Sequence, residues 1–408
     1  MKACTTGPSL PVAVRRRLGR VARDSGRRLP APGCPGRKVK GTAAAAAEAV
    51  TRFCRRIRDL SRSARIRKLR RRLIIESRRH NQGDAERTVT DLGEFAVIER
   101  AVQGRIQPPS TLIGPGDDAA LVRAADGRVA VSADMLVEGR HFRLDWSTPE
   151  QVGRKAVAQN GADIAAMGAR PTAFLVSMGC PPATPVSVAT GISDGIGLAA
   201  EAIGAGVVGG DLVQSGQVVV SVTVLGDLEG RAPVLRSGAR VGDVVAVAGR
   251  LGRSAAGLSL LLAGGATADD IEPECAALID AHRVPQPPYR AGVAAALAGA
   301  RAMTDISDGL IADLGHVAQA SGARIRIERA RIVPDPALAV AAGRLGADPW
   351  GWILTGGEDH ALAATFPPDA MLPAGWSVIG AVVEGPGDVV VDGTAWTTSG
   401  GWQSFGTG

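Results

Sequence analysis

The chain has 408 residues, of which 45% are hydrophobic and 3% aromatic, and its formal net charge is +7. This length exceeds that of one small domain, so we expect two domains with cores built mainly from Val, Ala, Leu and Ile. No apolar run is long enough to cross a bilayer, which argues against an integral membrane protein. The five cysteines are scattered and form no CxxC pair, which argues against a disulfide scaffold or a zinc site and favours a reducing, cytoplasmic setting.

The positive charge is confined to the N-terminal segment. Residues 1–88 contain 25 basic and 6 acidic residues, a balance of +19, whereas the remainder contains 22 basic and 34 acidic residues, a balance of −12. Three interpretations remain open: the segment binds nucleic acid or acidic lipid, it is a targeting segment, or it is a disordered extension upstream of the true start. We favour the last interpretation, because the body of the protein needs nothing from this segment.

The first half of the body alternates between helical and strand patterns. We expect, in order, a helix at 94–102, a strand at 129–131, a helix at 148–166, a strand at 173–177, a helix at 187–203 and a strand at 217–225. The helix that starts at Thr148 has the clearest start signal, with a proline at its first position and Gln151 completing a capping box. On this helix Lys155, Gln159 and Asp163 share one face, because they are spaced four residues apart.

A candidate domain boundary follows at residues 226–242, which are rich in Gly, Arg and Pro. It divides the body into an N-terminal domain at 89–230 and a C-terminal domain at 231–408. In the second domain we expect a strand at 244–248, helices at 254–262, 289–297 and 310–321, and a strand at 324–327. Helices and strands alternate in both halves, so the predicted fold class is α/β.

Six acidic motifs mostly occur beside glycines or at predicted strand ends, where a backbone can approach phosphate closely. They are Asp117-Asp118, Ser132-Ala133-Asp134, Asp163, Gly209-Gly210-Asp211, Asp305-Ile306-Ser307-Asp308 and Glu358-Asp359. Each one alone is compatible with a turn or a helix cap, and Ser307 and Asp308 would suit the N-cap of the helix that follows them. Together they predict a site for a hard, oxygen-seeking cation such as Mg²⁺, which keeps coordination positions open for phosphate.

The body lacks the signature motifs of several common enzyme classes. It contains no GxxxxGK[ST], GxSxG or HExxH sequence, which argues against P-loop enzymes, α/β hydrolases and zinc metalloproteases. Lys155 is its only lysine, so any nucleotide charge would be neutralised by metal ions, backbone N–H groups and arginines such as Arg236. His282 and His316 read as ordinary helix or loop histidines.

Seven spaced motifs between residues 92 and 402 resemble those of the thiamine-monophosphate kinase family, which belongs to the superfamily of aminoimidazole-ribotide synthetase. They are Gly93-Glu94-Phe95, Gly116 to Ala120, Asn160 to Asp163 with Ala165 to Ala169, Gly209-Gly210-Asp211, Arg236 to Ala239 with Gly242-Asp243, Asp305 to Leu310 and Gly356 to Asp359. The resemblance implies a kinase that transfers the γ-phosphoryl group of ATP to the phosphate of thiamine monophosphate. It also implies a homodimer, in which the N-terminal α/β domains pack their sheets into a shared β-barrel, and a separate C-terminal α/β domain.

The resemblance further implies a set of site residues. The magnesium ligands would be Asp118, Ser132, Asp134, Asp163, Asp211, Asp305 and Asp308. ATP would contact Gly210, Asp211, Arg236 and Ser307, and thiamine monophosphate would contact His141, Glu358 and Trp402. One departure matters: the family usually has a hydroxyl residue between Ser132 and Asp134, where this chain has Ala133, so we expect one oxygen donor fewer.

This chemistry agrees with the residues, because an acceptor phosphate is already a nucleophile and needs no strong general base. Two alternatives remain. The first is another enzyme of the superfamily: aminoimidazole-ribotide synthetase, selenophosphate synthetase or the hydrogenase-maturation dehydratase. The last two are disfavoured, because residues 89–135 and the C-terminal end contain no cysteine. The second alternative is a nucleic-acid-binding protein that acts through the basic segment.

Overall fold

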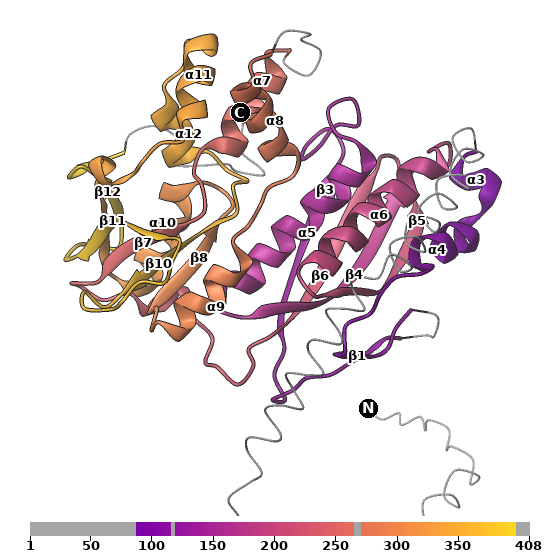
Figure 1. Ribbon diagram of the computed structural model, residues 1–408, viewed down its shortest axis with the longest axis horizontal. Coiled ribbons are helices and arrows are strands. Elements are labelled where there is room, and N and C mark those ends of the chain that lie inside the picture. Colours follow the sequence, from indigo (N-terminus) through magenta and orange to yellow (C-terminus); the bar gives the residue numbers. More distant parts are fainter. Residues whose placement is uncertain (1–86, 116–118, 265–270, 397–408) are drawn as a thin grey trace, which may run out of the picture. The chain divides into compact units, whose positions relative to one another are not determined.

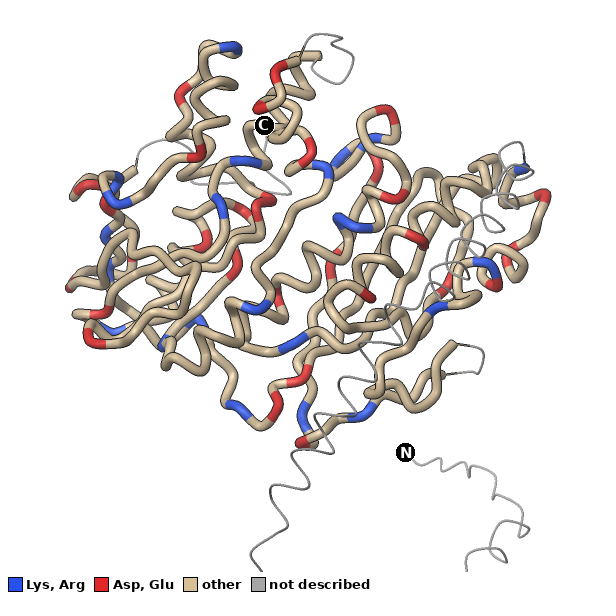
Figure 2. Tube along the Cα trace, viewed as in Figure 1, with Lys and Arg blue, Asp and Glu red and all other residues tan. Residues whose placement is uncertain are grey.

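The computed structural model describes residues 87–115, 119–264 and 271–396 (Figure 1). The basic segment up to residue 86 and the expected site residues Asp118 and Trp402 lie outside the described residues. No helix in the described ranges has the length and apolar character needed to span a membrane. Acidic and basic residues are distributed over both halves of the described body (Figure 2).

The first half is built on a four-stranded sheet with the strand order β3-β6-β4-β5. Its strands are β3 (Ala130–Val137), β4 (Arg170–Cys180), β5 (Gly206–Gln214) and β6 (Val219–Asp227). The β4–β5 pair is parallel and the other pairs are antiparallel. Helices α5 (Pro149–Ala166) and α6 (Val186–Ala202) pack against each other on one face of this sheet (Figure 1). Before the sheet come α3 (Val89–Leu92), α4 (Glu94–Val102), β1 (Thr111–Ile113) and β2 (Leu121–Val122).

The two faces of this sheet differ in burial, because successive side chains of a strand point to opposite faces. On β3, Leu136 is 1% exposed and faces the helices, whereas Val131 and Met135 on the other face are 60% and 50% exposed. Ser132 and Asp134 share the helix-facing side with Leu136. We call the opposite side of the sheet the open face; its exposed apolar side chains are Val131, Met135, Leu175 and Val213.

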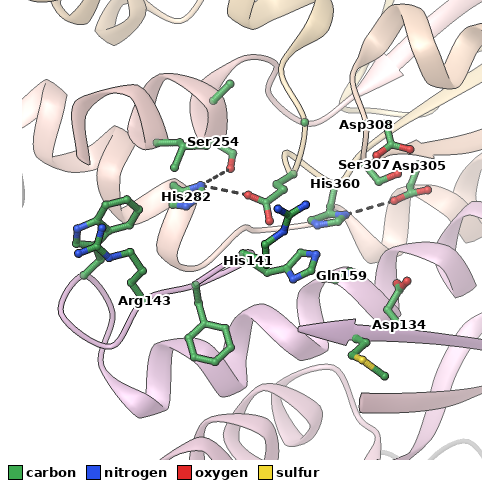
Figure 3. Close-up of a pocket in the computed structure, with 18 of the residues that line it drawn as sticks. Asp134, His141, Arg143, Gln159, Ser254, His282, Asp305, Ser307, Asp308 and His360 are labelled. Atoms are coloured by element: carbon green, nitrogen blue, oxygen red, sulfur yellow. Dashed lines mark hydrogen bonds and ion pairs between the residues drawn. The ribbon is translucent and has the colours of Figure 1, made fainter. Parts of the chain in front are cut away.

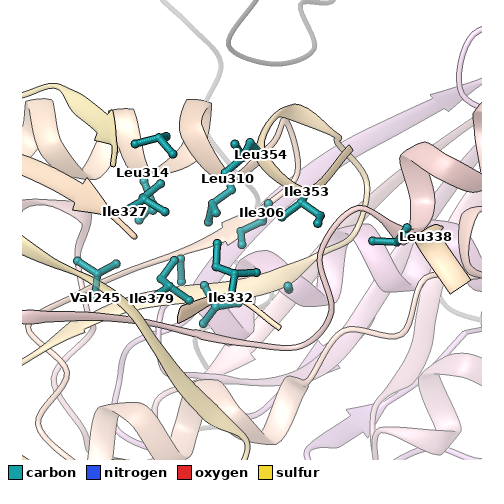
Figure 4. Packing of buried hydrophobic residues seen from close by; sticks show 14 of the residues in the cluster. Val245, Ile306, Leu310, Leu314, Ile327, Ile332, Leu338, Ile353, Leu354 and Ile379 are labelled. Atoms are coloured by element: carbon teal, nitrogen blue, oxygen red, sulfur yellow. The ribbon is translucent and has the colours of Figure 1, made fainter. Parts of the chain in front are cut away.

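The second half is built on a seven-stranded sheet with the order β13-β12-β9-β11-β7-β10-β8. Its strands are β7 (Val244–Ala248), β8 (Ala302–Ile306), β9 (Arg324–Ile327), β10 (Ala361–Phe366), β11 (Trp376–Val383), β12 (Val389–Val391) and β13 (Thr394–Ala395). Its helices are η2 (Arg236–Gly238), α7 (Arg253–Leu262), α8 (Pro273–Arg283), α9 (Tyr289–Leu297), α10 (Leu310–Ser321), η3 (Arg329–Arg331), α11 (Pro336–Leu345) and α12 (Pro349–Thr355). Ile306, Leu310, Leu314 and Ile327 belong to the main core of this half (Figure 4).

Helix α5 connects the two halves. It packs on the first sheet and also contacts α8, α9, β8 and β10 of the second half. Trp146, just before α5, packs against the core of the second half as well. Side chains on the second-half side of α5 therefore lie where the two halves meet.

All the predicted helices are present in the structure. The helices expected at 94–102, 289–297 and 310–321 occur with those bounds as α4, α9 and α10. The capping box of α5 is present, because the Thr148 side chain accepts from the Gln151 amide and Gln151 bonds back to the Thr148 backbone. Helix α10 ends at Gly322, which adopts the left-handed conformation with φ of 63°.

Two acidic motifs lie inside strands. The strand predicted at 129–131 is longer than expected, since β3 extends to Val137, so Ser132 and Asp134 lie within the strand and not at its end. Gly210 and Asp211, to which no element was assigned from the sequence, lie inside β5. In both cases a β-ladder with neighbouring strands continues the strand through the motif, and those partners are distant in sequence.

Glycines allow α5 and α6 to approach closely, and this contact makes a stability prediction. A Cβ built at Gly195 of α6 would lie 2.0 Å from the carbonyl oxygen of Glu150 in α5. Gly195→Ala should therefore lower the free energy of unfolding by about 3 kcal/mol, because backbone atoms cannot move aside as a flexible side chain can. Urea unfolding followed by circular dichroism measures this change.

Gly343→Ala in α11 is the matched control, because a Cβ there meets nothing within 4 Å. This control should stabilise the protein by up to about 1 kcal/mol through helix propensity. Equal effects of the two substitutions would show that the close approach of the helices does not limit the packing.

Candidate active site

A cavity of about 640 Å³ lies between the two halves and brings most of the predicted site residues together (Figure 3). The predicted residues that line it are Asp134, His141, Asp163, Asp305, Ser307, Asp308 and Glu358. Asp134 comes from β3 and Asp163 from α5, whereas Asp305 lies near the end of β8 and Glu358 follows α12. Residues that are far apart in the sequence thus form one polar cavity.

The carboxylates on the first-half side are held by defined hydrogen bonds. The Ser132 hydroxyl donates to Asp163 Oδ2 at 2.6 Å, across the contact between β3 and α5. The Asp134 amide donates to Asn160 Oδ1 at 3.1 Å, and Asn160 Nδ2 donates to the Ala156 carbonyl at 2.9 Å. Asn160 is 1% exposed, so this link between the helix and the strand is shielded from water.

The electrostatics of this cluster favour a bound cation. Burial raises the pKa of Asp163 to about 7, and the negative charges of Asp305 and Asp134 add to the shift. Burial also raises the pKa of Asp134, while the positive charge of a protonated His360 acts in the opposite direction. Burial and mutual repulsion disfavour the ionised form of these carboxylates, and a metal ion placed between them would stabilise that form.

The donor set fits Mg²⁺ better than a metal that requires a closed protein cage. Within the described ranges, no group of three His, Cys, Asp or Glu side chains is arranged to hold one ion. Mg²⁺ is commonly bound by one or two carboxylates together with waters and substrate phosphates, so this arrangement suits it. The Ser132 hydroxyl and the Asp163 carboxylate both offer oxygen ligands, which also suits Mg²⁺. Asp118, another carboxylate of the expected metal-binding set, lies outside the described residues.

The carboxylates of the second half come from β8, from the loop after it and from the first turn of α10. Asp305 is 3% exposed, and its Oδ2 lies 3.3 Å from Nδ1 of the buried His360. Asp313 Oδ2 accepts from the amides of Asp308 and Gly309, each at 3.0 Å, and so holds the loop in place. Burial raises the pKa of Asp313 to about 7, with the charge of Asp305 adding to the shift.

The expectation that Ser307 or Asp308 caps α10 is wrong, because the N-cap residue is Gly309 and it has no side-chain cap. The loop amides bond instead to Asp313, in the first turn of the same helix. Both Ser307 and Asp308 therefore remain available to the cavity that they line. The sequence signal for this arrangement is Asp313, an acidic residue in the first helical turn.

The opposite side of the cavity carries a network of polar side chains. Lys155 Nζ lies 2.9 Å from Glu358 Oε1 and donates to the His141 carbonyl at 3.0 Å. His282 Nδ1 lies 3.3 Å from Glu358 Oε2 and 3.1 Å from Ser254 Oγ. His282 was expected to be an ordinary helix or loop histidine, but it lines the cavity. Sequence spacing could not reveal this role, because its partners lie on other elements.

Glu358 and Asp359, adjacent in the sequence, have different roles. Glu358 lines the cavity, whereas Asp359 accepts from the backbone amides of Gly252 at 2.5 Å and Ser254 at 2.9 Å. These amides belong to the start of α7, so Asp359 serves as a cap contributed from a distant segment. Burial raises the pKa of Asp359 to about 7, although the two amides act in the opposite direction.

Several expected site residues do not line this cavity. Gly210 and Asp211 are exposed on β5, and Arg236 is exposed in η2. Ala133 points to the open face of β3, away from Ser132 and Asp134. The missing hydroxyl at Ala133 therefore removes no oxygen from the carboxylate cluster of this cavity, in contrast to the expectation from the sequence.

Comparison with known proteins identifies the class first. The AIR synthase related protein N-terminal domain matches residues 116–228, and the AIR synthase related protein C-terminal domain matches residues 240–393. The chain is thus a two-domain protein of the AIR synthase-related class, with the mixed α/β fold described above.

Individual relatives identify the family. The thiamine-monophosphate kinase of Mycobacterium tuberculosis (strain CDC 1551) is 58% identical over 328 residues, which cover 80% of this chain and 96% of that protein. The protein of the same name from Corynebacterium glutamicum is 46% identical over 323 residues, covering 78% and 95%. A solved structure of AaThiL complexed with AMPPCP and TMP is 35% identical, has a TM-score of 0.65 and covers 77% of this chain and 97% of that one. The chain belongs to the thiamine-monophosphate kinase family.

Proposed function

We propose that the protein is an ATP-dependent kinase that phosphorylates thiamine monophosphate to thiamine diphosphate. The observation that carries the proposal is the cavity in which carboxylates of both halves meet, in a chain 58% identical to a thiamine-monophosphate kinase. AMPPCP is an ATP analogue, and the related AaThiL binds it together with TMP. A cavity of about 640 Å³ has the size of a site for small ligands.

The transfer is a direct in-line displacement. An oxygen of the acceptor phosphate attacks the γ-phosphorus of ATP, and the bond from that phosphorus to the β-phosphate oxygen breaks to release ADP. No protein base is required, so the chain contributes mainly by holding two anionic groups in line. Bound Mg²⁺ would supply the charge neutralisation that lets the two phosphates approach.

We assign the residues to three roles from the family resemblance, and the positions of some of them support the assignment. Metal binding is assigned to Asp118, Ser132, Asp134, Asp163, Asp211, Asp305 and Asp308. ATP binding is assigned to Gly210, Asp211, Arg236 and Ser307, and acceptor binding to His141, Glu358 and Trp402. The positions of Asp134, Asp163, Asp305 and Asp308 on one cavity support the metal assignment. The positions of His141 and Glu358 beside Lys155 support the acceptor assignment.

The test is a kinase assay on the purified full chain with ATP, Mg²⁺ and thiamine monophosphate. Thiamine diphosphate and ADP should appear in equal amounts, without inorganic phosphate, when the products are separated by chromatography. Unphosphorylated thiamine is the control acceptor and should give no product, because it lacks the attacking phosphate. Release of inorganic phosphate without thiamine diphosphate would point to another ATP-dependent enzyme of the superfamily.

We also propose that the protein is a homodimer that pairs through the open face of the first sheet into a shared β-barrel. Val131, Met135 and Val213 on this face are 60%, 50% and 54% exposed, and an apolar face of this kind suits an interface. Light scattering should therefore give twice the chain mass of 41.7 kDa, and Val131→Asp should shift it toward one chain. A mass of one chain for the wild type would contradict the proposal.

Further proposals concern the domain bounds, the position of Asp211, the cellular setting and nucleic acid. We propose that the two domains extend over 89–230 and 231–408, in line with the two sheets. Asp211 lies on β5, next to the open face, so a role in ATP or metal binding would place that site beside the dimer contact. The free thiols of Cys180 and Cys275 suit a reducing, cytoplasmic setting. We propose no nucleic-acid partner for the body.

A further inference from the structure

Lys155 is the only lysine in residues 89–408, and it is buried. It lies in the middle of α5 with 2% of its surface exposed. The residues that line the cavity include its neighbours His141 and Glu358 but not Lys155 itself. A buried lysine is costly unless its charge is paired and its donors are satisfied, so its presence in this helix requires a reason.

The contacts of Lys155 join the two residues assigned to the acceptor. Its Nζ lies 2.9 Å from Glu358 Oε1, in the second half, and donates to the His141 carbonyl at 3.0 Å, in the first half. The buried ammonium group of Lys155 therefore contacts a residue on each side of the cavity. Because Lys155 belongs to helix α5, which packs on the first sheet, both contacts have fixed positions relative to that sheet.

The segment that carries Glu358 has a strained backbone. Glu358 and His360 have φ angles of 63° and 50°, in the left-handed region that side-chain-bearing residues rarely adopt. The Glu358 amide donates to the Ser307 carbonyl at 2.7 Å, and the His360 amide donates to the Ile306 carbonyl at 2.9 Å. Such a conformation persists where surrounding contacts over-determine it, and the Lys155 ion pair is a side-chain contact of this kind.

The charges around Glu358 balance only when Lys155 is present. Burial lowers the pKa of His282 to about 4, and the nearby Lys155 cation acts in the same direction, so His282 is neutral. Burial by itself raises the pKa of Glu358, but the attraction of Lys155, with smaller contributions from His282 and His360, gives a net lowering of this pKa. Lys155 is thus the permanent cation in direct contact with this carboxylate.

We propose that Lys155 is a positioning residue for the acceptor site: it acts through the Glu358 carboxylate and the His141 backbone without touching the substrate. The proposal rests on the proposed function, since it concerns the binding of thiamine monophosphate. The ion pair places one oxygen of Glu358 against Lys155 and leaves the residue 29% exposed toward the cavity. Loss of Lys155 should release Glu358 and widen the acceptor site, while the carboxylates Asp134 and Asp163 keep their own contacts.

The experiment compares Lys155→Met, Glu358→Gln and the double variant with the wild type in the full-length protein. Lys155→Met should raise the KM for thiamine monophosphate by on the order of tenfold or more, with the KM for ATP changed by less than about twofold. The double variant should be no worse than the more impaired single variant, because the two substitutions remove one interaction. Arg154→Met is the matched control on the same helix: its side chain is 42% exposed, and it should change neither KM.

The double variant also shows whether a high KM results from a loss of folding. Lys155→Met alone leaves an unpaired carboxylate, whereas the double variant removes both charges and should recover most of the thermal midpoint. A recovered midpoint together with a high KM for thiamine monophosphate separates positioning from structural support. Unchanged KM values in Lys155→Met, an equal rise in both KM values, or additive effects in the double variant would each overturn the proposal.

The activity of the wild type distinguishes a failure of the positioning proposal from a failure of the proposed kinase function. If the wild type does not phosphorylate thiamine monophosphate, the proposed function fails. The thermal midpoints of the four proteins still report whether Lys155 and Glu358 are coupled, and additive midpoints would refute the interaction on which positioning depends.

Discussion

Asp163→Asn should reduce kcat by on the order of a hundredfold or more while the protein remains folded. The amide has nearly the same shape as the carboxylate and can still accept the hydrogen bond that Ser132 donates at 2.6 Å. What it lacks is the negative charge beside the transferred phosphoryl group, where a metal ion would be held. A loss of this size corresponds to about 3 kcal/mol of transition-state stabilisation. Steady-state kinetics at saturating ATP and thiamine monophosphate provide the measurement.

The control for this substitution is Glu201→Gln, an equally conservative change at an exposed position of α6. It should leave kcat within about twofold of the wild type, because surface substitutions away from special features have small effects. A Mg²⁺ titration of the Asp163→Asn variant separates weaker metal binding from impaired chemistry. If the variant shows both a near-normal rate and the same Mg²⁺ dependence as the wild type, Asp163 is not part of the metal site.

The sequence predicted best those features that depend on neighbouring residues. The capping box at Thr148 and Gln151 determines where α5 starts, and four-residue spacing places Gln159 and Asp163 on its cavity side. A rigid helix preserves that spacing in the folded protein. The acidic cluster could therefore be located approximately before any tertiary contact was known.

The contacts that complete the site could not be predicted, because they join segments that are distant in the chain. Asp359 caps α7 through Gly252, which lies 107 residues earlier. His282 lies beside Glu358, a residue distant in the sequence, in the polar network of the cavity. No local pattern distinguishes a histidine with such partners from one that packs in an ordinary core.

Strand faces were the other source of error. A one-residue step along β3 moves a side chain from the cavity side to the open face, so Ala133 and Asp134 face opposite environments. From the sequence alone, a hydroxyl at position 133 was expected to add an oxygen donor beside Ser132 and Asp134. The burial pattern of the strand places Ala133 on the open face, away from this cavity.

Magnesium should stabilise the protein far more at pH 8 than at pH 5.5. The pKa of Asp163 in the fold is about 7, against an ordinary value of 3.8. Below about pH 4 the group is protonated whether or not the chain is folded, so it costs the native state nothing. Between about pH 4 and 7 the native state keeps the proton and the unfolded state loses it, so stability without metal falls as the pH rises. Above about pH 7 the loss is complete and amounts to on the order of a few kcal/mol.

Bound Mg²⁺ reverses this loss, because it interacts favourably with the ionised carboxylate that the empty cluster disfavours. Thermal midpoints at both pH values, with Mg²⁺ or with a chelator, measure the effect. Asp313 and Asp359 also have pKa values raised to about 7, so the wild type alone does not isolate Asp163. The difference between wild type and Asp163→Asn does: in the chelator the variant should be the more stable protein at pH 8, and its response to Mg²⁺ should depend less on pH. An equal Mg²⁺ response at the two pH values in the wild type, or a variant less stable than the wild type at pH 8 without metal, would mean that the raised pKa of Asp163 does not reflect a site kept for a cation.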